Sequence, residues 1–409
     1  MFNTKIKLLL LFFGVCVINA VNIGDECIFY DDSRNESVDA VCEETTRCKE
    51  LLKTIDGGNR TMGPVCFYSA SKTGNCCPIL GPKPDTYCDQ MPPKPSFPSQ
   101  GHKVAWTKCI QNQRQVTCKK DKDGKTVYLV LSVGCNLEFN YSQRPVRQFA
   151  GTGEFPHIAS LGYKDDSPSG IAWLATGSLV SEKYILTSAS VLEHGTYGSV
   201  KFALLGTSTK ADTKNGKLID ISRRIAHEDY DSTTKENDIA LVELVKPVSF
   251  SELIRPICLP VAGIEYGDIR HVCGWKAERE YDVTRSLMRR HFREMSPSVC
   301  TKKLRTEELV FNSKNMICAS GVINDSSSET ERGAPLMSKV LNSEFTCNYI
   351  INGVLSASGR GLNAPVVYTN VSNHIDWIVQ NIWLEEYERD RFTNETDIKY
   401  LNILHSIQL

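Results

Sequence analysis

Short apolar runs separated by Gly, Ser and Asn turns fill the chain from about residue 148 onward. Runs of this kind, broken repeatedly by turn residues, are typical of an all-β barrel protein. The period changes in "VSNHIDWIVQNIW", where Ile375, Ile378 and Ile382 recur at spacings of three and four. That spacing predicts a helix. The pattern therefore indicates a β-barrel protein closed by one C-terminal helix, with a polar tail after Trp383.

Two patterns precede this region. "MPPKPSFPSQG", residues 91–101, is rich in proline and predicts an extended, fairly stiff connector. "VTCKKDKDGKTVYLVLSV" predicts a β-hairpin, because Asp123-Gly124 supplies a positive-φ turn and Val127 to Val133 suits a strand. We interpret the lysines around the turn as a solvated tip. The segment is either an elaborated linker or a small disulfide-stapled module.

Residues 1–20 have the pattern of a secretory signal, with Lys5 and Lys7, an apolar run from Leu8 to Val17, and Ala20 at the cleavage point. The run is too short to span a bilayer, and no later stretch is apolar enough. We therefore expect a soluble, secreted protein. A net charge of −1 does not favour nucleic acid or a charged surface as the main partner. No cofactor and no metal site is predicted.

Cysteine usage fits an oxidising compartment. The chain has 16 cysteines, of which Cys16 leaves with the signal. Six of the others crowd residues 21–80, a segment too short to bury much of a core, so we expect it to be stapled by disulfides. Six cysteines allow fifteen pairings. Six glycosylation sequons also fit secretion: Asn35, Asn59, Asn140, Asn324, Asn370 and Asn394.

The spacing of the first six cysteines is distinctive. Five residues separate Cys42 from Cys48, and Cys76 is adjacent to Cys77. This spacing resembles the arthropod clip domain. The resemblance implies the pairs Cys27–Cys76, Cys42–Cys66 and Cys48–Cys77. Another kind of secreted disulfide knot is the alternative.

Six stretches of the later chain resemble the trypsin-like serine protease family, in the family's order. They are "GEFPHIASLGY" (153–163), "TGSLVSEKYILTSAS" (176–190), "ENDIALVELVKPVSFSELIRPICLP" (236–260), "CGW" (273–275), "APLMS" (334–338) and "PVVYTNV" (365–371). The resemblance implies an all-β fold of two six-stranded antiparallel β-barrels with a C-terminal helix, preceded by a small disulfide-rich clip domain. The whole chain resembles an insect clip-domain serine protease homologue, and this resemblance implies secretion into haemolymph.

The resulting domain organisation has five parts. We expect a signal peptide at 1–20, a clip domain at 21–80, a linker and hairpin segment at 81–143, an inactive protease-like domain at 144–385, and a polar tail at 386–409.

The resemblance places three residues at the family's catalytic positions: Ser190 for histidine, Asp238 for aspartate and Arg332 for serine. Ser190 cannot act as a base near neutral pH. Arg332 offers neither a nucleophile nor a base. His194 lies four residues beyond Ser190, and we interpret it as a surface loop residue. Two of the three catalytic groups required by the mechanism are therefore missing.

Other parts of the family's machinery are also altered. Thr330 replaces a glycine whose amide helps to form the oxyanion hole. Ser326 stands at the floor of the specificity pocket, and Ser358 and Val366 replace glycines of its wall. A valine side chain in place of hydrogen is expected to plug the pocket.

The activation region departs from the family too. Family zymogens are cut to release an ammonium group that pairs with a buried aspartate. Here the new terminus coincides with Arg144-Pro145-Val146-Arg147, and Glu331 stands at the aspartate position. A charged terminus of this kind would be costly to bury. We expect either no cleavage or cleavage after Arg147.

Three disulfides follow from the protease resemblance. These are Cys273–Cys347, Cys300–Cys318 and a tether, Cys135–Cys258. Cys88, Cys109 and Cys118 then share one bond and one leftover thiol, which predicts a disulfide-linked dimer or mixed disulfide through this segment. Two other family disulfides have lost both halves, at Ala175 with Val191 and at Ser328 with Leu362.

Three functions are compatible with the sequence. The first is a non-catalytic cofactor or regulator in insect immune protease cascades, in prophenoloxidase activation, melanisation or opsonisation, with proteases, proenzymes or microbial surfaces as partners. The second is an adhesion or extracellular-matrix protein on an inactive protease scaffold. The third is an enzyme that uses Ser190 or Ser188 as a nucleophile, although no base is predicted beside either.

Overall fold

The computed structural model describes the backbone of four N-terminal strands and most of the chain between residues 96 and 389. The strands are β1 (Glu26–Asp31), β2 (Glu36–Glu44), β3 (Val65–Tyr68) and β4 (Thr73–Pro78). The other described residues are 96–120, 126–128, 148–150, 153–166, 170–261, 270–275, 286–304, 311–321, 331–339, 349–359 and 364–389. The signal segment, the clip-domain cysteine side chains and every sequon except Asn370 lie outside this description.

The chain divides into two compact units. In the first, the four N-terminal strands form one antiparallel sheet in the order β1-β2-β4-β3. The predicted hairpin belongs to the second unit, where β5 (Cys118–Lys120) pairs with β6 (Thr126–Tyr128). The hairpin prediction is therefore confirmed over these residues.

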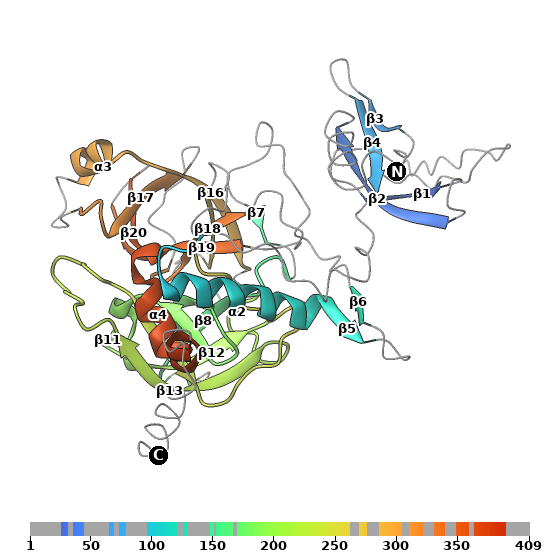
Figure 1. The fold of residues 1–409 in the computed structure, drawn as a ribbon. Helices are drawn as coiled ribbons and strands as arrows, with labels where there is room; N and C mark the ends of the chain where they lie inside the picture. The colour runs from blue at the N-terminus through green and yellow to red at the C-terminus, as the bar shows by residue number, and fades with distance from the viewer. Residues whose placement is uncertain are drawn as a thin grey trace, which may run out of the picture. The chain divides into compact units, whose positions relative to one another are not determined.

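The first barrel of the second unit closes through pairing of β12 with β8 and appears green in Figure 1. Along β13, Ile219 and Ile221 point inward between exposed neighbours, which is the two-residue period of a barrel strand. The six strands are β8 (Ile158–Lys164), β9 (Ile171–Leu179), β10 (Tyr184–Thr187), β12 (Gly198–Leu205), β13 (Lys217–Ala226) and β14 (Ala240–Leu244), and the short β11 (Glu193–His194) extends β12.

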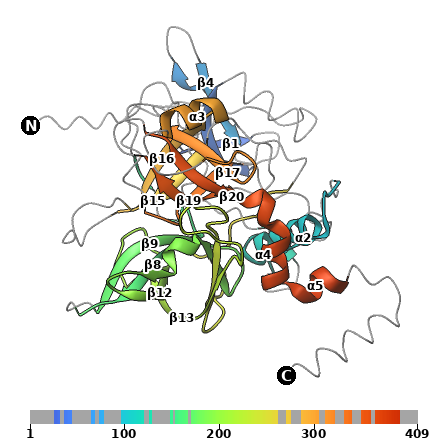
Figure 2. The same cartoon turned by 90° about the vertical axis from the view of Figure 1, so that its left-hand side faces the viewer.

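The second barrel closes through pairing of β15 with β16 and appears orange to red in Figure 2. Its six strands are β15 (Arg270–Gly274), β16 (Met288–Glu294), β17 (Met316–Gly321), β18 (Pro335–Lys339), β19 (Tyr349–Ser358) and β20 (Val366–Asn370), and β7 (Gln148–Phe149) extends β16. The predicted fold of two six-stranded antiparallel barrels is therefore confirmed.

Helices surround the barrels. The predicted C-terminal helix is α4 (Ile375–Ile382), which buries Ile375, Ile378 and Val379 in the core shared by both barrels. It follows the 3-10 turn η4 (Val371–His374) and is continued by α5 (Leu384–Arg389); α3 (Pro297–Leu304) precedes β17. Asn370 accepts a hydrogen bond from the amide of Ser372 and so caps η4.

An 18-residue helix that the sequence reading did not predict, α2 (Gln100–Thr117), lies along α4 in both Figure 1 and Figure 2. Asp376 of α4 accepts hydrogen bonds from the Gly101 amide at 2.9 Å and from the Ser99 hydroxyl at 3.0 Å. A carboxylate at a helix N-terminus accepts hydrogen bonds from amides that have no partner within the helix. Its negative charge also interacts favourably with the positive end of the helix dipole. The predicted connector, residues 91–101, is therefore wrong over Gln100 and Gly101, which begin the helix, and its residues 91–95 lie outside the described part of the chain.

The buried face of α2 explains why it stays on the barrels. Val104, Trp106 and Ile110 are each 5% exposed, and burial of such side chains stabilises by roughly 1.5–3 kcal/mol each. At the other edge, the Lys108 ammonium lies 2.5 Å from the Glu386 carboxylate. The α2 helix is thus an integral layer of the second unit.

The position of α2 overturns one disulfide prediction. Cys258 is bonded to Cys109 of α2, so the expected Cys135–Cys258 tether is wrong. Cys118 is also disulfide-bonded. An intermolecular bond through Cys109 or Cys118 is therefore wrong as well, because both thiols are used within the chain, and Cys88 lies outside the described residues.

A second disulfide prediction also fails. Cys273 is an unpaired thiol, fully buried in the core shared by the barrels, so Cys273–Cys347 is wrong. Cys273 lies in the same apolar core cluster as Leu186, Ile239 and Trp275. A buried cysteine of this kind behaves as a small apolar residue. The expected Cys300–Cys318 bond is present.

We expect His157 to make the fold acid-sensitive. Burial, and then the charge of Arg255, lower its pKa from 6.5 to about 3. Below pH 6.5 the unfolded chain therefore binds a proton that the folded chain refuses, and stability falls by about 1.4 kcal/mol per pH unit from this group until about pH 3. In urea unfolding between pH 7 and pH 4, the His157→Gln variant should lose stability less steeply than wild type. Equal slopes would contradict this assignment.

Candidate functional site

The Asp238 carboxylate is the centre of the candidate site. It is fully buried just before β14 and accepts three hydrogen bonds. The Ser190 amide donates to Oδ1 at 2.7 Å, the Ser190 hydroxyl to Oδ2 at 2.9 Å, and the Ser356 hydroxyl to Oδ2 at 2.5 Å. Thr369 of β20 also donates to the Asp238 carbonyl at 2.9 Å, so both barrels hold this residue.

The environment of Asp238 has opposing effects on its charge. Burial raises its pKa above the usual value, while the hydrogen bonds from Ser356 and Ser190 act in the opposite direction. Both carboxylate oxygens accept short hydrogen bonds from hydroxyl or amide groups. The carboxylate therefore has the surroundings of a structural acceptor that joins the two barrels.

Ser190 lies in the 3-10 turn η2 (Ala189–Val191), directly after β10. Its hydroxyl points at Asp238, with no imidazole between them, and no histidine of the described residues is hydrogen-bonded to either group. Ser188 is fully buried, and its Oγ lies 3.3 Å from Ser190 Oγ. A serine bonded directly to a carboxylate lacks a base matched to accept its proton near neutral pH.

The loop that carries Arg332 closes the other side of the site. Its backbone is fixed on both sides: the Thr176 amide donates to the Arg332 carbonyl at 3.0 Å, and the Gly333 amide donates to the Leu355 carbonyl at 2.9 Å. The Arg332 side chain is exposed. The nucleophile position thus presents a guanidinium group, which is always cationic.

Tyr230 lies near the candidate site. Burial, and then the charge of Asp238, raise the pKa of Tyr230 to about 12, while the charge of Arg332 and a hydrogen bond to Ser190 act to lower it. Asp238, Arg332 and Ser190 therefore all influence the pKa of the same phenol. Sequence reasoning missed Tyr230, because this residue lies in a polar turn between β13 and β14.

The structure also assigns contacts to Glu331, the residue at the family's activation position. Its carboxylate is buried, accepts a hydrogen bond from the Thr176 hydroxyl at 2.9 Å, and forms an ion pair with the Lys210 ammonium. Sequence reasoning missed Lys210, because a lysine in the polar stretch after β12 has the pattern of a solvated side chain.

The altered pocket positions have different surroundings. Val366 is fully buried in an apolar cluster of the second barrel, together with Phe292 and Leu336. Its ladder partner is Ser358, which is partly buried. Ser326 and Thr330 lie outside the described residues. The valine side chain therefore belongs to the barrel core.

His194 does not replace the missing base. It lies in β11, its Nδ1 accepts a hydrogen bond from the Thr196 amide at 3.2 Å, and its ring packs near Tyr163 and Tyr197. No contact connects it to Asp238 among the described residues. His194 therefore lies outside the site, but the prediction of a surface loop residue is wrong, because it is half-buried and belongs to a short strand.

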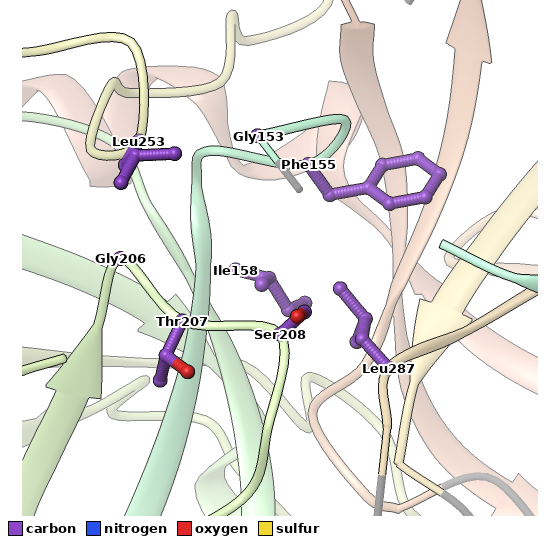
Figure 3. A pocket seen from close by; sticks show the side chains of 8 residues that line it. All are labelled: Gly153, Phe155, Ile158, Gly206, Thr207, Ser208, Leu253 and Leu287. Carbon is purple, nitrogen blue, oxygen red and sulfur yellow. The ribbon is translucent and has the colours of Figure 1, made fainter. Parts of the chain in front are cut away.

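The described residues contain a small pocket. Figure 3 shows a pocket of about 20 Å³, room for a single water molecule, between the first barrel and the chain around Leu287. Its lining is Gly153, Phe155, Ile158, Gly206, Thr207, Ser208, Leu253 and Leu287. The described residues contain no group of His, Cys, Asp and Glu that could hold a metal ion, and no described helix is long and apolar enough to cross a membrane.

Comparison with known proteins identifies the family to which the chain belongs. The sequence profile of the Trypsin family matches residues 147–378, more than half of the chain, so the chain belongs to this family of serine proteases. Within the family it is similar to clip-domain serine proteases of insects. It is 28% identical to CLIP domain-containing serine protease C9 of Anopheles gambiae, over 57% of this chain and 66% of that protein.

Two further relatives are named for melanisation. The chain is 28% identical to phenoloxidase-activating factor 3 of Holotrichia diomphalia, over 56% of this chain and 70% of that protein. It is 28% identical to melanization protease 1 of Drosophila melanogaster, over 65% of this chain and 72% of that protein. The chain thus spans about two thirds of the length of these relatives.

Proposed function

We propose that the protein is a secreted, non-catalytic clip-domain serine protease homologue. It acts as a binding cofactor or regulator in extracellular immune protease cascades of insects, in prophenoloxidase activation and melanisation or in opsonisation. Its partners are proteases or proenzymes of the cascade. The four-stranded N-terminal unit corresponds to the clip domain and provides a second binding module.

One observation carries this proposal. The Asp238 carboxylate is capped by Ser190 and Ser356, and the position facing them holds the exposed cation of Arg332. Acyl transfer in this family needs a nucleophile, a base and an orienting acid, and only the acid is present. The fold around it is retained, with both barrels closed. A fold can be retained while the function of its site changes. The names of the relatives point to a melanisation cascade.

A reconstituted cascade tests the proposal. Prophenoloxidase and an activating protease are mixed with and without the purified protein, and the appearance of phenoloxidase activity is followed. We expect the protein to change the rate or yield. The effect should survive treatment of the protein with a phosphonylating reagent that inactivates serine nucleophiles, followed by removal of the reagent.

Two results would count against the proposal. Loss of the effect after phosphonylation would indicate a working serine enzyme. Absence of any effect on the cascade, combined with binding to basement-membrane preparations, would favour the adhesion function.

A further inference from the structure

The ion pair between Lys210 and Glu331 has an unusual position. The two side chains are only 7% and 4% exposed. Lys210 comes from the turn that follows β12 in the first barrel, whereas Glu331 lies next to Arg332 in the loop that leads into β18 of the second barrel. The pair therefore ties the candidate site's loop to the opposite barrel.

The turn that carries Lys210 is shaped to direct this lysine inward. Ala211 has φ of +74°, a left-handed conformation that is uncommon for a residue other than glycine. The Asp212 amide donates to the Thr209 carbonyl at 3.1 Å, and the Thr213 amide to the Ala211 carbonyl at 2.8 Å. A non-glycine residue stays in this region only where its surroundings enforce it. Lys210 is buried while Lys214, four residues on, is exposed.

Glu331 needs a counter-ion because an isolated buried carboxylate is very costly. Lys210 pairs with Oε1, and the Thr176 hydroxyl donates to Oε2 at 2.9 Å. Both oxygens thus have a partner within the chain. A second ammonium group entering this site would have to displace Lys210, leaving another cation buried without a partner.

The chain near the expected cut is also held in place. Gln148 and Phe149 form β7 in register with Arg289 and Met288 of β16, and the Ala150 amide donates to the Leu287 carbonyl at 2.8 Å. A terminus created after Arg147 would therefore begin inside a paired strand.

We propose that Lys210 is a permanent internal counter-ion for Glu331, which holds the Arg332 loop in its final conformation before any cleavage. The surface formed by this loop is then the same in the intact and the cut chain. Lys210 is a positioning residue, and a partner that binds this face does not depend on proteolysis of the segment around Arg147.

The first test removes the counter-ion. The Lys210→Met variant keeps the length of the side chain and leaves Glu331 buried without a cation, so we expect the melting temperature to fall by about 10 °C. Lys183→Met is the matched control, because Lys183 pairs with Glu243 but is 39% exposed, and it should fall by no more than about 3 °C. The double variant Lys210→Met with Glu331→Gln should recover part of the loss. Equal effects of Lys210→Met and Lys183→Met would overturn the proposal.

The second test separates positioning from general stability. A recognition sequence for a specific protease is inserted between Gln143 and Arg144, and hydrogen exchange is measured at the amides of Thr176, Gly333 and Ala334 before and after cutting. With Lys210 present, we expect no change on cutting. In Lys210→Met these amides should exchange at least about tenfold faster. If that variant does not fold, the wild-type comparison still decides, since slower exchange after cutting would show that the new terminus orders the loop.

Discussion

Gly333→Ala is expected to lower the melting temperature by about 10 °C or more, or to prevent folding altogether. Gly333 has φ of +80°, and a Cβ placed there would lie 2.1 Å from the Thr176 carbonyl oxygen and 2.2 Å from Thr187 Oγ1. The Thr176 carbonyl cannot retreat easily, because it accepts a hydrogen bond from Thr187 at 2.8 Å. Backbone strain and steric overlap together place this change among the rare substitutions that cost about 4 kcal/mol or more.

Substitutions at two other glycines separate the effect of backbone strain from that of steric overlap. Gly198 has φ of +69° with nothing within 4 Å of a Cβ, so Gly198→Ala should cost only about 1–2 kcal/mol of backbone strain. Gly195 has open space and no positive φ, so Gly195→Ala should leave the melting temperature nearly unchanged. Thermal denaturation of the three variants checks the order. A Gly333→Ala protein as stable as wild type would show that the loop backbone is not held as described.

The second large effect concerns α2. If the chain is cut between Gln143 and Arg144 at an inserted protease site, the part that carries α2 should stay attached even after reduction of Cys109–Cys258. The contacts of Trp106 and Ile110 and the bonds to Asp376 remain. The measurement is size-exclusion chromatography in reductant without denaturant, where we expect one species.

Variants of α2 show what holds it. Trp106→Ala combined with Cys109→Ala should release the N-terminal part, because truncation of a buried aromatic side chain costs about 3–5 kcal/mol. Gln111→Ala with Cys109→Ala is the matched control and should stay attached, since Gln111 is exposed on the same helix. Separation of the reduced, cut wild-type protein into two species would contradict the docking of α2.

The barrels could be predicted from the sequence because residues close together in the chain indicate each strand and turn. Turn residues interrupt short apolar runs, and the stretch "NDIAL", which includes Asp238, leads into β14 and identifies its start. The helical spacing of Ile375, Ile378 and Ile382 was similarly decisive for α4.

The α2 helix could not be predicted in the same way. Its buried face includes Asn112 and Gln113, which break the apolar pattern. Its N-terminus is satisfied by Asp376, far along the chain. The error in the Cys258 pairing follows from this omission, because only the docked helix brings Cys109 beside Cys258.

Lys210 illustrates the same limit within the site. Its neighbours are polar, and only the tertiary structure turns it onto Glu331. The catalytic positions were different, because Ser190 and Asp238 each lie in a stretch that resembles the family, and Arg332 lies two residues before another. Cys273 lies between these cases: the cysteine was identified, but only the tertiary structure shows that its thiol is unpaired in the apolar core.

The most direct test of the central claim is active-site titration of the wild-type protein and of a repaired variant, Ser190→His with Arg332→Ser. This variant restores all three catalytic side chains around Asp238. The family resemblance places Ser358 and Val366 at glycines of the specificity-pocket wall, and a misplacement of bound substrate by about 1 Å can cost about a hundredfold in rate. The family resemblance also places Thr330 at the oxyanion-hole glycine, and loss of one oxyanion donor costs about a hundred- to a thousandfold in rate. With thermal melts confirming that both proteins are folded, we expect no burst and no peptide hydrolysis above blank from either, before or after a cut at Arg147. A stoichiometric burst from the repaired variant would show that only the triad separates this chain from a working protease, and a burst from the wild type would refute a non-catalytic function.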